Sequence, residues 1–150
     1  GGTLPLAATV ASQKIFDAFW SDDPMHALMH GPTFMGNALA CAAANASLDL
    51  FEREPRLLQS AEIGKAMGKQ LGRCIGIKGV KDVRVKGAIG VVELEKIADM
   101  NALKSALVNE GVWVRPFRNI VYLTPALTIE PDDLSKLTNA IVSVVGKRTF

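Results

Sequence analysis

The sequence predicts a mainly helical first half followed by a compact α+β unit. Two patterns indicate the second part: apolar and polar residues alternate along Val80–Val85, and an apolar stripe at helical spacing follows Pro131. In the first half, the run of small residues Ala38–Ala44 predicts a helix whose backbone lies close to its neighbours. The expected sheet therefore belongs to the second half, where two helices accompany it.

The composition of the chain excludes several classes of protein. The chain has 150 residues, of which 49% are hydrophobic and 21% charged, as in an ordinary folded domain. Its net charge is +2 and its basic residues are spread along the chain, so we expect no nucleic-acid partner. The apolar runs are too short for a bilayer, so we expect no membrane partner either. Two cysteines, Cys41 and Cys74, without a CxxC or HExxH pattern, predict neither a disulfide framework nor a metal site.

The first half contains four expected elements. Residues Ala7–Ser12 predict a short buried strand, and a helix capped by Ser12 should continue to about residue 20. Met25–Gly36 predicts an ordered loop, because its apolar side chains are costly to leave in water. Asn37 is a good N-cap for a helix that ends near residue 53.

The second half opens with a helix that begins at Pro55 and ends near residue 76. Gly64, Gly68 and Gly72 would share one face of it, which suggests contact with a neighbouring backbone. Strands are expected at Val80–Val85 and Ala88–Leu94, with a bend or bulge at the glycines that follow and interrupt them, Gly87 and Gly90.

Helix signals and a hairpin pattern follow. Asp99 opens a helix that Gly111 ends. Residues 112–115 and 120–124 are both strand-like and predict a hairpin. Pro131 and the two aspartates after it predict the start of the last helix.

Three residues are candidates for chemistry. In the segment His30–Asn37, Thr33 can offer its hydroxyl and backbone N–H to an anion at a helix start; a turn that only begins the helix explains it equally well. Arg115 follows an apolar strand and could hold a carboxylate, although spacing alone favours a solvent-exposed or locally paired arginine. Tyr122 could donate a hydrogen bond or simply be half-buried in a strand.

The segment Met29–Asn37, followed by Leu39–Leu48, closely resembles the class III pyridoxal-phosphate aminotransferases. Supporting stretches are Gly1–Thr9, Asp82–Glu93, Gly111–Phe117 and Ile120–Pro125. The resemblance implies the α/β architecture of fold-type I pyridoxal-phosphate enzymes, with a large domain and a smaller C-terminal α+β domain. Residues 1–54 would end the large domain and residues 55–150 would form the small one, in a cytoplasmic homodimer.

The same resemblance assigns roles to four residues. Pro32 and Thr33 would bind the phosphate of pyridoxal 5′-phosphate, in a loop that reaches the neighbouring subunit's active site. Gly31 and Arg115 would contact substrate, Arg115 through the substrate carboxylate. The biotin-pathway members that the chain resembles imply transfer of an amino group from S-adenosylmethionine to 8-amino-7-oxononanoate, giving 7,8-diaminononanoate.

The family's Schiff-base lysine would lie just upstream of Gly1, and Lys14 does not match its motif. Since the chain also begins on Gly-Gly without an initiator methionine, we expect a C-terminal fragment that holds no catalytic residue and is inactive alone. Two alternatives remain: a class III aminotransferase with other substrates, and a non-catalytic α+β interaction or regulatory domain.

Overall fold

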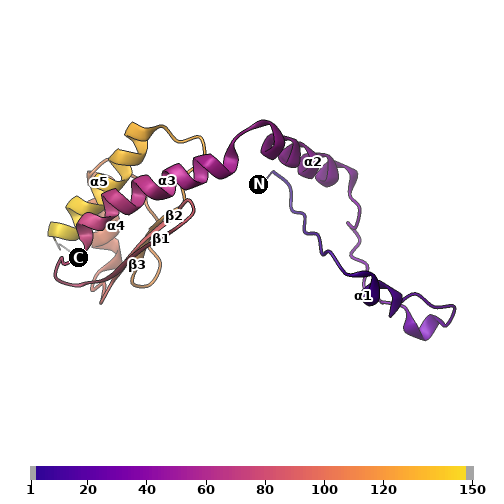
Figure 1. Ribbon diagram of the computed structural model, residues 1–150. Helices are drawn as coiled ribbons and strands as arrows, with labels where there is room; N and C mark the ends of the chain where they lie inside the picture. The colour runs from indigo at the N-terminus through magenta and orange to yellow at the C-terminus, as the bar shows by residue number, and fades with distance from the viewer. Residues whose placement is uncertain (1–2, 148–150) are drawn as a thin grey trace. The chain divides into compact units, whose positions relative to one another are not determined.

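The computed structural model describes residues 3–147 of the chain, which divides into two compact units, Gly1–Glu54 and Pro55–Phe150. The first unit contains α1 (Gln13–Asp17), η1 (Pro24–His26) and α2 (Ala38–Arg53); the second contains α3 (Arg56–Leu71), η2 (Gly72–Cys74), β1 (Val80–Lys86), β2 (Ile89–Leu94), α4 (Met100–Asn109), β3 (Ile120–Leu123) and α5 (Pro131–Lys147) (Figure 1).

The first unit has almost no core of its own. Among its described residues, only Ala40 is buried. Its large apolar side chains are exposed, among them Val10 at 97%, Met25 at 86% and Met29 at 91%. The expected ordered loop at Met25–Gly36 therefore leaves its apolar residues uncovered within this unit.

The strand predicted at Ala7–Ser12 is wrong: these residues form no strand and are exposed. A strand needs hydrogen-bonding partners on a second strand, and none of the described residues pairs with this segment. The helix after it is also shorter than predicted, because α1 ends at Asp17 and the Ser12 side chain makes no capping bond.

The start of α2 is confirmed. The Asn37 side-chain oxygen accepts a hydrogen bond from the Ala40 N–H at 2.9 Å, satisfying one of the donors that every helix start leaves free. The helix ends at Arg53, as its small-residue and apolar pattern predicted.

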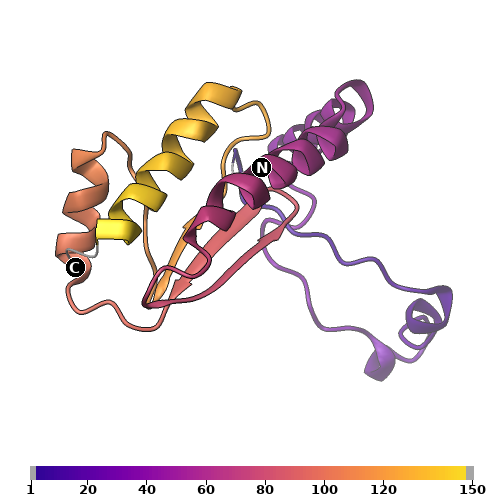
Figure 2. The ribbon, with the colours of Figure 1, turned by 60° about the vertical axis from the view of Figure 1, so that its left-hand side comes forward.

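The second unit is a three-stranded antiparallel sheet covered by helices on one face. The strand order is β1-β2-β3. α3 packs on β1 and β2, and α5 lies between α3 and α4 (Figure 2). The core contains α3, strand and α5 side chains with no more than 1% exposure: Met67, Leu71, Val92, Val121 and Ile141.

The predicted hairpin of residues 112–115 with 120–124 is wrong. β3 pairs instead with β2, with Val92 opposite Val121, while residues 112–115 form no strand. Val112 and Val114 are both buried in the core, so the alternation that suggested a strand reflects burial of every second side chain rather than pairing.

Two glycines let α3 approach the β1–β2 hairpin closely. A Cβ atom on Gly64 would collide with the Gly87 carbonyl oxygen, and one on Gly90 would lie 2.8 Å from Leu71 Cδ1. The backbone contact predicted for the glycine face is thus confirmed at Gly64, but a Cβ on Gly68 or Gly72 would meet nothing within 4 Å. Gly87 has a φ of 53° in the turn between β1 and β2, so the bend predicted there is confirmed. The shift in register lies between Val80 and Asp82 rather than at Gly90.

The helix predicted from Pro55 to about residue 76 is shorter in the structure, because α3 ends at Leu71 and the 3-10 helix η2 ends at Cys74. The signals predicted for α4 and α5 are confirmed. The Asp99 carboxylate accepts hydrogen bonds from the N–H groups of Asn101 and Ala102 at the start of α4. Gly111 follows that helix with a φ of 77°, a conformation that glycine adopts without strain. α5 begins at Pro131 with Asp132 and Asp133 in its first turn.

Within residues 3–147, no helix combines the length and apolar character needed to cross a membrane.

We predict opposite effects for two glycine substitutions in α3. Gly64→Ala should lower the free energy of unfolding by roughly 1–3 kcal/mol, because its Cβ meets the Gly87 carbonyl oxygen. Gly68→Ala is the matched control: this glycine is exposed with free space around it, so alanine should raise stability by up to about 1 kcal/mol through helix propensity. Denaturant unfolding followed by circular dichroism measures both; equal effects would contradict the close contact.

Candidate functional site

The loop that leads into α2 presents free hydrogen-bond donors. The Met35 N–H donates to the Pro32 carbonyl at 2.9 Å, and the Asn37 N–H donates to the Phe34 carbonyl at 3.0 Å. These bonds turn the chain tightly just before the helix begins. Thr33 is exposed, and neither its hydroxyl nor its backbone N–H has a partner among residues 3–147.

This donor set fits a phosphate. A hydroxyl and a backbone N–H on one residue, four positions before the N-cap of α2, can both donate to an anionic oxygen. Gly31 lies just before the turn, and a Cβ on it would meet nothing within 4 Å. The open space beside Gly31 leaves room for a ligand on that side of the loop.

Arg115 lies in the second unit, between two buried residues, Val114 and Pro116. Its own side chain is exposed and makes no hydrogen bond or ion pair with any described residue. The side chain adjoins a cleft of about 410 Å³ lined by Trp113, Val114, Arg115, Tyr122, Leu123, Thr124, Pro125 and Leu137. A guanidinium without a protein partner beside an apolar cleft is suited to an anionic ligand.

The structure brings some of the candidate residues together. Gly31, Pro32 and Thr33 share one loop of the first unit, and Arg115 shares its cleft with Tyr122 in the second unit. Sequence reasoning missed Trp113, which lines the same cleft and is 83% exposed. Its position between two residues expected to face the core, Val112 and Val114, was the available signal that it points outward.

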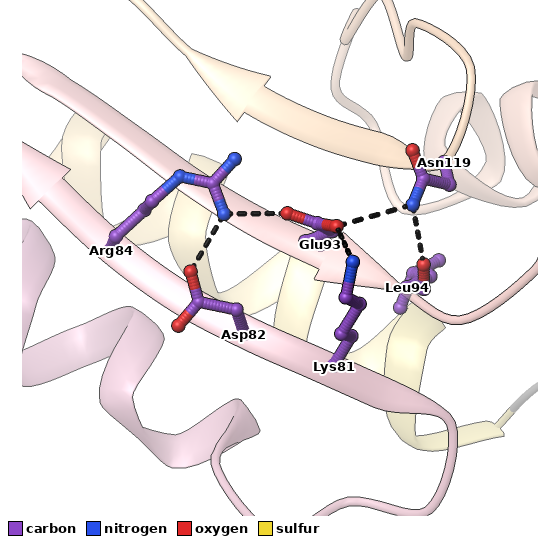
Figure 3. A network of polar contacts seen from close by, with 6 residues as sticks. All are labelled: Lys81, Asp82, Arg84, Glu93, Leu94 and Asn119. Carbon is purple, nitrogen blue, oxygen red and sulfur yellow. Dashed lines mark hydrogen bonds and ion pairs between the residues drawn. The ribbon is translucent and has the colours of Figure 1, made fainter.

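A cluster of charges lies on the outer face of the sheet (Figure 3). Glu93 on β2 accepts from Lys81 Nζ and from Arg84 Nη1, each at 2.7 Å, and Arg84 also contacts Asp82 at 2.7 Å. The hydrogen bonds from Lys81 and Arg84 lower the pKa of Glu93 from 4.5 to about 2. Each charge in the cluster is paired with an opposite charge. We therefore interpret the cluster as a structural connection between β1 and β2 and not as a ligand site.

The amide of Asn119 extends this cluster toward Arg115. Asn119 Nδ2 lies 3.4 Å from Glu93 Oε1 and donates to the Leu94 carbonyl at 2.9 Å (Figure 3). Asn119 belongs to the turn that follows Arg115, so β2 is tied directly to the segment that carries this arginine. The sequence pattern gave no sign of this connection.

Comparison with known protein families shows which family the chain belongs to. Residues 1–145 match the family model described as aminotransferase class III. The chain belongs to the class III aminotransferases. The resemblance read from its motifs is therefore confirmed.

Among curated members of the family, the chain is similar to two enzymes named adenosylmethionine-8-amino-7-oxononanoate aminotransferase. It is 43% identical over 147 residues to the one from Buchnera aphidicola subsp. Acyrthosiphon pisum, covering 98% of this chain and 34% of that protein. It is 42% identical over 146 residues to the one from Mycobacterium leprae, covering 97% and 33%. The chain thus spans about a third of the length of these relatives.

Two solved aminotransferase structures confirm the expected fold class, that of the fold-type I pyridoxal-phosphate enzymes. The adenosylmethionine-8-amino-7-oxononanoate aminotransferase from Methanocaldococcus jannaschii matches 99% of this chain and 37% of its own, with a TM-score of 0.87 and 28% identity. An amine transaminase from an uncultivated Pseudomonas species, solved in a form with bound pyridoxal phosphate, matches 99% and 36%, with a TM-score of 0.84 and 30% identity.

Proposed function

We propose that this chain is part of a pyridoxal-phosphate-dependent aminotransferase of biotin biosynthesis. The reaction moves the amino group of S-adenosylmethionine to 8-amino-7-oxononanoate and gives 7,8-diaminononanoate. The observation that carries the proposal is the identity of 42–43%, over almost the whole chain, to two relatives that bear this enzyme's name. An aminotransferase with other substrates is the second candidate, supported by the amine transaminase at 30% identity.

In this proposal, Thr33 holds the cofactor phosphate with its hydroxyl and its backbone N–H, both of which lack protein partners among the described residues. Pro32 shapes the turn through its carbonyl, which accepts the Met35 N–H. Gly31 leaves space for substrate. The cofactor supplies an electron sink for the amino transfer, and the protein orients it.

Arg115 binds the substrate carboxylate. Its planar guanidinium can donate two parallel hydrogen bonds to a carboxylate, which fixes the orientation of the substrate as well as its charge. Trp113 and Tyr122, which line the same cleft, provide a wall against which the rest of the substrate packs. The role of Arg115 is therefore to bind and orient rather than to move a proton.

The exposed apolar surface of the first unit supports a further part of the proposal. Residues 1–54 belong to the large domain, and residues 55–150 form the small one. In the complete protein, a cytoplasmic homodimer, other segments of the large domain and the second subunit cover the apolar side chains that this unit leaves exposed. The Schiff-base lysine lies in those other segments.

The complete protein should form 7,8-diaminononanoate from the two substrates, whereas the 150-residue chain alone should form none. We expect no pyridoxal-phosphate absorbance band to survive dialysis of the isolated chain, because no lysine in it matches the family's motif. Chromatographic detection of product measures the first expectation and visible spectroscopy the second. Product from another amine acceptor, with none from 8-amino-7-oxononanoate, would favour the second candidate function.

Thr33→Ala should lower cofactor retention in the complete protein, because two donors to the phosphate become one. Thr33→Ser keeps the hydroxyl and is the matched control, so it should retain cofactor as the unmodified protein does. The measurement is the pyridoxal phosphate remaining after dialysis, by absorbance. If all three proteins stay equally loaded, Thr33 does not bind the phosphate.

Arg115→Ala should raise the KM for the amino donor S-adenosylmethionine, which carries a carboxylate, by roughly thirtyfold or more. Arg115→Lys should recover only part of the loss, because an ammonium group cannot make the paired hydrogen bonds of a guanidinium. Steady-state kinetics with a second amine that lacks a carboxylate is the control, since its KM should not change. An equal loss with both amines would remove Arg115 from carboxylate binding.

A further inference from the structure

The turn that follows Arg115 holds an arginine in a backbone conformation that favours glycine. Arg118 has a φ of 51°, and it is the one non-glycine residue with positive φ in the described range 3–147. Such a conformation persists only where the surrounding structure imposes it, and it is found preferentially near functional sites. Arg118 lies three residues after Arg115.

Two backbone hydrogen bonds close this turn. The Phe117 N–H donates to the Ile120 carbonyl at 2.9 Å, and the Ile120 N–H donates to the Phe117 carbonyl at 3.0 Å. Arg118 and Asn119 are the two residues between them. The Arg118 guanidinium lies 5.4 Å from the centre of the Phe117 ring, so its side chain folds back over the turn.

Asn119 fastens the closed turn to the end of β2. The Leu94 N–H donates to the Asn119 carbonyl at 2.8 Å, and Asn119 Nδ2 donates to the Leu94 carbonyl at 2.9 Å (Figure 3). The backbone and the side chain of one residue thus bind both polar groups of Leu94. The same amide faces Glu93, which Lys81 and Arg84 hold in place from β1.

The backbone around Arg115 is held on both sides. The Arg115 side chain has no partner of its own among residues 3–147, so the position of its backbone sets where the guanidinium can reach. On the amino-terminal side, that backbone is held by buried Val114. On the other side, it is held by buried Pro116 and then by the turn, whose Phe117 is 59% exposed and contributes little to the core.

We propose that Asn119 is a positioning residue for Arg115: it anchors the turn at Arg118 to β2 and so fixes the place from which the guanidinium reaches the cleft. The inference rests on the proposed function, in which Arg115 binds a substrate carboxylate. Asn119 itself is not among the residues that line the cleft. Replacing Asn119 should therefore weaken binding of the substrate carboxylate even though the Arg115 guanidinium is still present.

The test uses the complete protein and two variants. Asn119→Ala removes the amide, and Asn119→Asp keeps its size but replaces the donor with an acceptor that faces the Leu94 carbonyl and Glu93. Both should raise the KM for S-adenosylmethionine, which carries a carboxylate, by about ten- to a hundredfold, the effect of a displaced binding group. The kcat, and the KM for an amine without a carboxylate, should change little.

The matched control is Asn139→Ala. Asn139 is an exposed asparagine on α5 that accepts a hydrogen bond from Arg73, away from the cleft, so its loss should leave both KM values unchanged. In addition, the double variant Asn119→Ala with Arg118→Gly should recover part of the lost affinity, because glycine adopts positive φ without an anchor.

The outcomes separate the two proposals. If Arg115→Ala discriminates between the two amines but Asn119→Ala and Asn119→Asp do not, the positioning role is overturned while the carboxylate role of Arg115 stands. If Arg115→Ala itself fails to discriminate, both fall together. Should Asn119→Ala not fold, Asn119→Asp and the double variant decide: unchanged discrimination in the folded variant overturns the inference.

Discussion

The close approach of α3 to the β1–β2 hairpin is the constraint on which the second unit depends. Gly64 allows the helix backbone to meet the Gly87 carbonyl, and Gly90 leaves room for Met67 and Leu71 above the sheet. With the hairpin fixed in this way, β3 can add to β2 and direct Val121 and Leu123 into the same core. The segment between α4 and β3, which carries Arg115, then has a fixed point at each end.

Paired and unpaired charges have different roles in this unit. Glu93 is paired with Lys81 and Arg84, and the hydrogen bonds from these two residues lower its pKa. Hydrogen bonds from Lys147 and Ser143 similarly lower the pKa of Glu110 at the end of α4. Arg115 has no such partner in the described chain, and it lies beside a cleft. A satisfied charge holds elements together, whereas an unsatisfied one is available to a ligand.

The elements predicted correctly are those whose ends are set by nearby residues. Asn37 and Asp99 cap helices through bonds to N–H groups no more than three residues away, and Gly111 and Pro131 act within a single turn. Besides the helices that end early, the errors concern pairing between distant segments. The strand at Ala7–Ser12 has no partner, and residues 112–115 bury alternate side chains without joining the sheet.

The sequence by itself determined the family, through the motif around Thr33 and the stretches near Arg115, and it determined most helix boundaries, because both depend on residues close together in the chain. Only the tertiary structure decided that β3 pairs with β2, that Gly64 but not Gly68 meets a backbone, and that Asn119 fastens the turn beside Arg115 to Leu94. The physical reason is distance along the chain: Asn119 and Leu94 are 25 residues apart. No pattern of neighbouring residues predicts that the Asn119 amide donates a hydrogen bond to the carbonyl of Leu94.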